Sequence, residues 1–392
     1  MLTSLSALIA TSVVAGPLAS AASVDPCALR RTEAHHSEGL DSWNPAYPRP
    51  ARVLDSLMLF LSFPDSLPAT TPDELAADYY PDTTAFFDRA SYGRFRLREH
   101  PRRQWTSMPA ASTSYGIQRD WDAGLRGRYL RDAVAAADPS VDFSRYDIVY
   151  LIADPNAPGV DSDATKVVNF DRPIRVDDTD LRRIVTVFEQ HPPDRNVLAH
   201  ETGHVFDLPD LYHRPEDGKG DWDTHVGDWD LMGSQFAMAP DPFGWHKWKV
   251  GWLGGQQIDC VRTPGIGLHT IAPLAAPPAP GAPPTKLVVV RTGRGSVIAI
   301  EARGAVGNDV GTCSEGVLIY RVRSDAASGA GPVEVLDGHP DSGACWGSSV
   351  YPPLADAPLG IGESLESAED GLRVTVNGRT ADGAWSVKVV KE

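Results

Sequence analysis

Two histidines, His200 and His204, enclose Glu201 in the segment 196–206 (NVLAHETGHVF). Residues at positions i and i+4 lie on the same face of an α-helix, so the spacing predicts a helix that directs both imidazoles to one side. Two imidazoles on one helical face can bind one metal ion, with the Glu201 carboxylate beside it. The alternative is a helix on which both histidines are satisfied by hydrogen bonds and no metal is bound.

Zinc held in this way lowers the pKa of a water molecule to ~7, and a neighbouring carboxylate can take the proton as the water attacks a carbonyl. We therefore expect zinc as the cofactor, with His200 and His204 as ligands and Glu201 as the general base. The extended motif H-E-x-x-H-x-x-G-x-x-H places a third ligand six residues after the second histidine, at Asp210. His213 and Asp207 are the alternatives. Asp207 stands at the glycine position of the motif, where aspartate tolerates a left-handed turn.

Further segments around this motif resemble the secreted metallopeptidases of the immune inhibitor A type, over residues 50–255. The segments are Ala199-His200-Glu201-x-Gly203-His204, Leu208-Pro209-Asp210-Leu211-Tyr212, Gly227-Asp228-Trp229-Asp230-Leu231-Met232-Gly233 and Trp245-x-Lys247-x-x-x-Gly251-Trp252-Leu253, with Ala90-Ser91-Tyr92-Gly93, Tyr115-Gly116 and Tyr146-Asp147 upstream. The resemblance implies a metzincin-like fold, a catalytic zinc and endopeptidase activity outside the cell. It also makes Met232 the methionine of the turn beneath the metal. The chain departs from the family at Asp207, and no long propeptide is visible between Ala22 and Pro50.

The chain has 392 residues, enough for two or three domains at ~150 residues each. We expect an α+β protein with a signal peptide (1–22), an N-terminal extension (23–49), a zincin-type catalytic domain (50–255) and a β-sandwich-like, β-rich C-terminal domain (256–392). A Pro-rich loop at 273–284 lies near the start of the last domain. The strands are expected at 52–63, 95–98, 146–153, 183–188, 286–291, 296–301, 316–323, 372–376 and 385–390, and the helices at 71 onwards, 117–137 and 196–206.

The net charge and the composition argue against several classes of binding partner. Net charge is -16, which argues against nucleic-acid binding and against docking on anionic membranes. The first 22 residues carry no charged side chain, and small residues near Ala21 are typical of a secretory signal rather than a membrane span. We therefore expect a secreted monomer that acts on protein or peptide substrates. No serine-nucleophile elbow, Walker loop or dinucleotide-binding motif occurs in the sequence.

Four cysteines in a secreted chain favour two disulfides. Of the three pairings we expect Cys27–Cys260 and Cys313–Cys345. A zinc site made of all four is the alternative, but no two of them are spaced two residues apart.

Other residues near the motif have two interpretations each. Tyr212, His225 and His246 are candidate electrophiles or structural side chains. An Asp-rich turn could bind calcium or could simply be a turn; its members are Asp221, Asp223, Asp228 and Asp230. The competing function is a secreted protein with an inactive zincin domain, whose β-rich domain binds a glycan or a surface partner.

Overall fold

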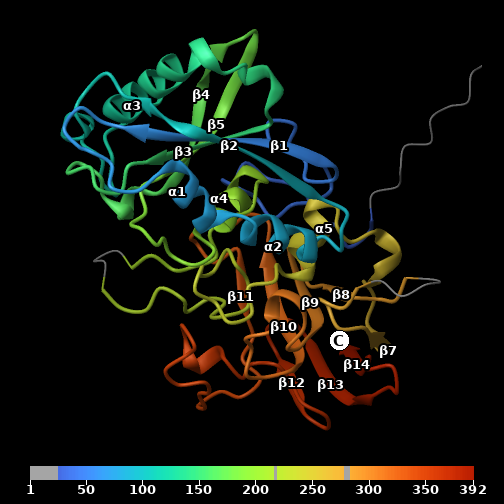
Figure 1. Ribbon diagram of the computed structural model, residues 1–392. Coiled ribbons are helices and arrows are strands. Elements are labelled where there is room, and N and C mark those ends of the chain that lie inside the picture. Colours follow the sequence, from blue (N-terminus) through green and yellow to red (C-terminus); the bar gives the residue numbers. More distant parts are fainter. Residues whose placement is uncertain (1–24, 216–218, 278–282) are drawn as a thin grey trace, which may run out of the picture.

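The computed structural model describes residues 25–215, 219–277 and 283–392. The predicted signal peptide therefore lies outside the described residues, as does the centre of the Pro-rich loop. The described part of the chain is a mixed α+β protein that contains three β-sheets and five α-helices (Figure 1). The predicted α+β class is confirmed at this level.

The first sheet has the strand order β2-β1-β3-β5-β4. Neighbouring strands are parallel except for β4, which runs antiparallel to β5 at one edge. Helix α3 covers one face, whereas α1, α2 and α4 lie against the other (Figure 1). These elements are β1 (Val53–Ser62), α1 (Pro72–Tyr79), α2 (Asp82–Ala90), β2 (Arg96–Ser107), α3 (Ala123–Ala137), β3 (Ile148–Ala153), β4 (Lys166–Val176), β5 (Thr179–Val187) and α4 (Val197–Val205).

Strand β1 shows why both faces of this sheet are covered. Successive side chains of a strand point to opposite faces. Leu57, Leu59 and Leu61 accordingly join the core beneath α3, while Met58 and Phe60 join the core that contains α4. An uninterrupted apolar run is therefore required here, as the sequence predicts.

The helix expected at 117–137 begins only at Ala123, so its predicted start was wrong. The Asp122 carboxylate accepts a hydrogen bond from the Leu125 N–H at 2.9 Å and caps the helix there. Just before it, Trp121 is buried and its indole N–H donates to the Tyr115 carbonyl at 2.7 Å. Residues 117–122, which were expected to be helical, therefore form a turn in which Trp121 is buried.

Strand β4 was not expected from the sequence, and it contains Pro173, which lacks the N–H that a strand ladder needs. The structure accommodates the proline in two ways. Strand β4 is an edge strand, and its register with β5 is irregular between Asn169 and Ile174. Both are settings in which strands tolerate proline.

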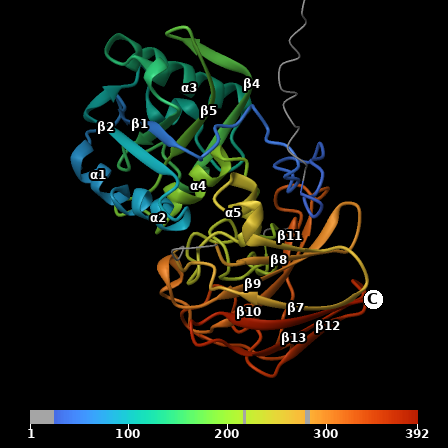
Figure 2. The ribbon, with the colours of Figure 1, turned by 90° about the vertical axis from the view of Figure 1, so that its right-hand side faces the viewer.

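The C-terminal part consists of two further sheets that face one another across a shared core (Figure 2). Their strand orders are β11-β10-β9-β8-β6 and β12-β13-β14-β7. Val288 and Ile300 of the first pack with Val374 and Val387 of the second. The strands are β6 (Ile258–Val261), β7 (Gly265–Ile271), β8 (Leu287–Arg291), β9 (Ser296–Arg303), β10 (Gly316–Arg323), β11 (Val333–Val335), β12 (Ser364–Ser367), β13 (Leu372–Arg379) and β14 (Trp385–Lys391), preceded by helix α5 (Gly244–Val250).

A single apolar core runs across the expected domain boundary at residue 255. It joins Phe60 of β1 and Val205 of α4 to Val289 of β8 and Leu318 of β10. A buried ionic group reinforces the same junction: the Arg303 guanidinium of β9 donates to the carbonyls of Trp229, Ala239 and Asp241 at 2.9–3.0 Å. The two parts of the chain therefore share one interior.

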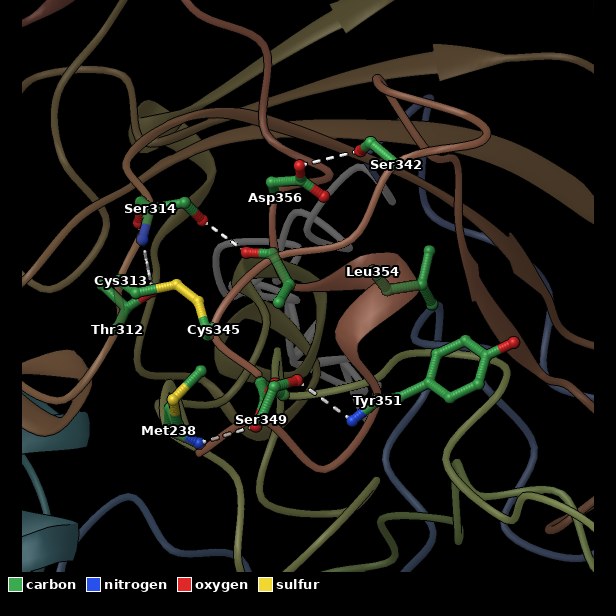
Figure 3. Close-up of a disulfide and its surroundings, with 12 residues drawn as sticks. Met238, Thr312, Cys313, Ser314, Ser342, Cys345, Ser349, Tyr351, Leu354 and Asp356 are labelled. Carbon is green, nitrogen blue, oxygen red and sulfur yellow. Dashed lines mark hydrogen bonds between the residues drawn. A yellow bond between two sulfur atoms is a disulfide. The ribbon is translucent and has the colours of Figure 1, made fainter. Parts of the chain in front are cut away.

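Both expected disulfides are present. Cys27–Cys260 fastens residues 25–49, here called the N-terminal strap, to strand β6. Cys313–Cys345 lies beside the segment that contains Tyr351 and Leu354 (Figure 3). The Leu354 carbonyl accepts from the Trp229 indole at 2.8 Å, so the segment beside this disulfide contacts the loop that leads to Met232.

No helix within the described ranges combines the length and the apolar character that crossing a bilayer requires.

Candidate metal centre

Helix α4 places His200, Glu201 and His204 beneath the first sheet. All nine of its residues are buried. The helix begins after Asn196, whose φ of 60° turns the chain and whose carbonyl accepts the His200 N–H at 2.9 Å. The predicted helix is thus confirmed, and both of its histidines line one small cavity of about 170 Å³.

Asp210 meets the two histidines in this cavity. Its Oδ1 lies 3.0 Å from His204 Nε2 and 3.5 Å from His200 Nε2. The donor atoms of the three residues all lie within 4.8 Å of one another. Within the described ranges, His200, His204 and Asp210 form the one such group of three or more His, Cys, Asp or Glu side chains.

Hydrogen bonds on the far side of each ring fix which nitrogen faces the cavity. His200 Nδ1 lies 2.9 Å from the Leu231 carbonyl, and His204 Nδ1 lies 2.8 Å from the Leu208 carbonyl. A carbonyl oxygen can only accept, so both Nδ1 atoms carry a proton. In its neutral form each ring therefore presents a bare Nε2 lone pair to Asp210, which is the arrangement of metal-binding histidines.

The three converging donors fit a cation. Asp210 Oδ1 is buried, and two imidazole lone pairs that face a carboxylate need a positive charge between them. Without a metal, a proton on His204 supplies that charge. Burial lowers the pKa of His204, but the neighbouring Asp210 carboxylate outweighs burial and raises it to about 9. Two imidazoles and one carboxylate are a donor set that suits zinc.

Glu201 lines the same cavity but lies outside the group of three. Burial raises its pKa, against opposing effects of His204 and His200. One of its oxygens, Oε2, is buried without a hydrogen-bond partner. A buried carboxylate that lies next to the donors, with one oxygen free of hydrogen bonds, is placed to accept a proton.

Asp207 occupies the left-handed turn expected of it, with φ at 65°. Its carboxylate points away from the cavity into an ion pair with Arg31 and a 2.9 Å contact with His36 Nδ1, both from the N-terminal strap. It is therefore excluded as the third donor. The His36 ring in turn stacks on His204, with centroids 5.7 Å apart.

Met232 lies directly beneath α4. It is buried against Gly203 of the helix, and its carbonyl accepts the Leu211 N–H at 2.9 Å. The preceding residue, Leu231, supplies the carbonyl that orients His200. The turn around Met232 thus supports the histidine helix from below, in the place that the resemblance implies.

The candidate electrophiles lie in different places. Tyr212 lines the cavity, with its ring stacked 6.4 Å from that of His200. His246 is fully buried between Asp230 and Glu38, at 2.9 and 2.8 Å, and His225 lies against His213, outside the residues that line the cavity. The structure therefore contradicts a role for His225 or His246 as electrophile.

The Asp-rich turn gives no support to a calcium site. Asp228 accepts hydrogen bonds from the Met238 and Val350 N–H groups, at 3.0 and 3.3 Å. Asp230 accepts from the Met232 and Phe243 N–H groups, both at 2.7 Å. The carboxylates of Asp228 and Asp230 therefore stabilise the turn around Met232 through hydrogen bonds. A calcium site in this turn stays a prediction.

Sequence reasoning missed the residues that enter the site from elsewhere in the chain. His35 and His36 of the N-terminal strap and Lys166 of β4 line the cavity, and Ser328 contacts Asp210. Adjacent histidines at 35 and 36 were the one visible signal in the sequence. The others carry no local pattern.

No protein-family model matches this chain. No curated protein matches it either.

Proposed function

We propose that the protein is a zinc-dependent endopeptidase with a zincin fold of the metzincin type, related to the immune inhibitor A metallopeptidases. One observation carries the proposal. His200, His204 and Asp210 converge on one point, and the Glu201 carboxylate, one oxygen of which has no hydrogen-bond partner, lies beside it in an open cavity. A purely structural metal site needs no such carboxylate, because its coordination is closed by protein ligands.

Zinc, when bound, supplies Lewis-acid activation of a water molecule and of the scissile carbonyl. Glu201 takes the proton of the attacking water. Its raised pKa, caused by burial, favours that transfer, and the same carboxyl can pass the proton to the leaving amine. The Leu231 and Leu208 carbonyls hold the two imidazoles in the tautomer that keeps both Nε2 atoms free.

Tyr212 is placed to assist at the carbonyl oxygen. Burial and, after it, the Asp210 carboxylate raise the pKa of its hydroxyl well above 10. The phenol therefore keeps its proton near neutral pH, and when it is not bonded to Asp210 it can donate a hydrogen bond within the cavity.

The cavity borders the edge strand of the first sheet, which favours an extended peptide as substrate. Thr165, Lys166 and Val167 line it together with Glu201, and β4 is the terminal strand of its sheet. An edge strand presents unpaired backbone groups that an extended chain can match. We further propose that the protein works outside the cell, since two disulfides are typical of oxidising compartments.

The test is Glu201→Gln, with Glu189→Gln as its matched control. Burial raises the pKa of both carboxyls, but Glu189 lies outside the metal cavity. Zinc-loaded wild type and Glu189→Gln should cleave casein-derived peptides, and a chelator should stop them. Glu201→Gln should bind equal zinc and lose activity ~10⁴-fold or more, at or beyond the upper end for general-base catalysis.

Two outcomes would contradict the proposal. A zinc-loaded wild type that cleaves no peptide would favour the alternative, a binding protein with a structural metal. Equal cleavage by wild type and Glu201→Gln would assign the base to another residue.

A further inference from the structure

A loop of the C-terminal β-rich part reaches the third metal donor. It comprises residues 324–332 and connects β10 to β11. Ser328, at its centre, lies 118 residues from Asp210 in the sequence and contacts it directly. The residues that line the metal cavity itself all lie between His35 and Tyr212.

Three hydrogen bonds join this loop to Asp210. The Ser328 hydroxyl donates to Asp210 Oδ2 at 2.9 Å, and its oxygen accepts the Asp210 N–H at 2.8 Å. The Gly329 N–H donates to the Asp210 carbonyl at 2.9 Å. The N–H, the carbonyl and one carboxylate oxygen of Asp210 are thus all held by the loop.

These contacts fix the direction of the other carboxylate oxygen of Asp210, Oδ1. With Oδ2 held by Ser328, the carboxylate cannot rotate freely, and Oδ1 stays directed at His204 and His200. Asp210 also lies outside helix α4, on an irregular segment after the turn at Asp207. A donor on irregular backbone depends on its neighbours for orientation, more than the two helical histidines do.

Ser328 also connects the loop to the other side of the cavity. Its own N–H donates to the His35 carbonyl at 3.1 Å, and His35 and His36 line the cavity from the N-terminal strap. The strap is itself tied to the neighbouring Ser324 carbonyl through Ser37 Oγ and Thr32 Oγ1, both at 2.6 Å. The loop therefore braces the strap and the metal donor together.

We infer that Ser328 is a positioning residue for the metal centre, and that the C-terminal β-rich part is a component of that centre rather than a detachable module. This inference rests on the proposed function, since it concerns the same metal. The Ser328 hydroxyl fixes the Asp210 carboxylate in the orientation that binds the ion, so metal affinity depends on a residue from the loop between β10 and β11.

The test compares three full-length, disulfide-intact variants with wild type: Ser328→Ala, Ser328→Thr and Ser342→Ala. Ser342 is a matched control because its hydroxyl also donates to an aspartate, Asp356 Oδ2, at 2.8 Å, but far from the cavity. Zinc affinity is measured by competition with a chromophoric chelator, and the cobalt-substituted proteins are compared by their visible absorption spectra.

Ser328→Ala should bind zinc about 10–100-fold more weakly, the usual effect of removing an outer partner of a ligand, with a shifted cobalt spectrum. Ser328→Thr keeps the hydroxyl and should restore affinity and spectrum, and Ser342→Ala should match wild type. Wild-type affinity in Ser328→Ala would overturn the inference alone. So would equal losses in Ser328→Ala and Ser328→Thr. A wild type that takes up no zinc would overturn the proposed function as well.

Discussion

Gly203 leaves the space that the Met232 side chain fills. A Cβ atom at Gly203 would overlap Met232 Sδ and lie 3.1 Å from its Cε. Gly203 lies between Glu201 and His204 on α4. Because it has no side chain, α4 can pack closely against the turn around Met232.

Gly203→Ala should therefore destabilise the protein by ~1–3 kcal/mol, the usual effect of overpacking a core, and should weaken zinc binding by displacing His204. Gly127→Ala in α3 is the control. A Cβ there would meet only the flexible Arg131 guanidinium, at 3.1 Å, so the usual helix preference for alanine should stabilise by ~0.5–1 kcal/mol. Denaturant unfolding measures both. A neutral Gly203→Ala would contradict the packing described here.

Removing the third donor should affect zinc binding in a residue-specific way. Asp210→Ala should lower zinc affinity strongly because Oδ1 is one of the three converging donors. His213→Ala should change it little, since its ring lies against His225 outside the cavity. Chelator competition gives both affinities. The reverse order would mean that the third ligand has been misassigned.

His246 should remain protonated well above neutral pH. Burial lowers its pKa, but Asp230 and then Glu38 outweigh burial and raise it to about 10. The folded pKa therefore exceeds the unfolded value of 6.5, so this contribution to stability is complete below pH 6.5 and is lost as pH rises through 10. The free energy of unfolding should decline over that interval.

Nitrogen NMR of the imidazoles checks this directly. At pH 8 both nitrogens of His246 should carry protons. His225, whose pKa is lowered by burial, should be neutral in the same sample and serves as an internal reference. A neutral His246 at pH 8 would contradict the charge assignment of this buried group.

The two disulfides should differ in their effect on stability. Cys27–Cys260 joins residues 233 apart and Cys313–Cys345 joins residues 32 apart. Loop-closure entropy predicts losses of about 5 and about 4 kcal/mol respectively, and the first pair also holds the strap that carries His36. Paired Cys→Ala variants should therefore lower Tm more at 27/260 than at 313/345. A larger drop at 313/345 would contradict this ranking.

Local sequence patterns predicted the framework of the site. The spacing of His200 and His204 predicted helix α4, since helical geometry is set by residues four apart. The apolar runs predicted β1 and β3, because a strand buried on both faces needs apolar residues throughout. Asp207 was correctly expected to adopt a left-handed turn. In each case the signal and the structure lie within a few residues of one another.

The same reasoning failed for contacts between residues that lie far apart in the chain. His246 was a candidate electrophile, yet it is buried against Glu38, 208 residues away. Ser328 and Lys166 gave no usable signal, although both lie close to the candidate metal donors. Nothing in their own neighbourhoods distinguishes them from ordinary surface residues.

The sequence by itself therefore determined the chemistry of the candidate site. It supplies two imidazoles, one neighbouring carboxylate, and a second carboxylate, Asp210, after the turn at Asp207. Tertiary structure alone decided how those donors are oriented. Ser328 and the strap reach the site only because the second sheet shares one apolar core with α4. Burial of apolar surface is non-directional and leaves no periodic pattern between distant segments, so the contacts that follow from it appear only once the chain has folded.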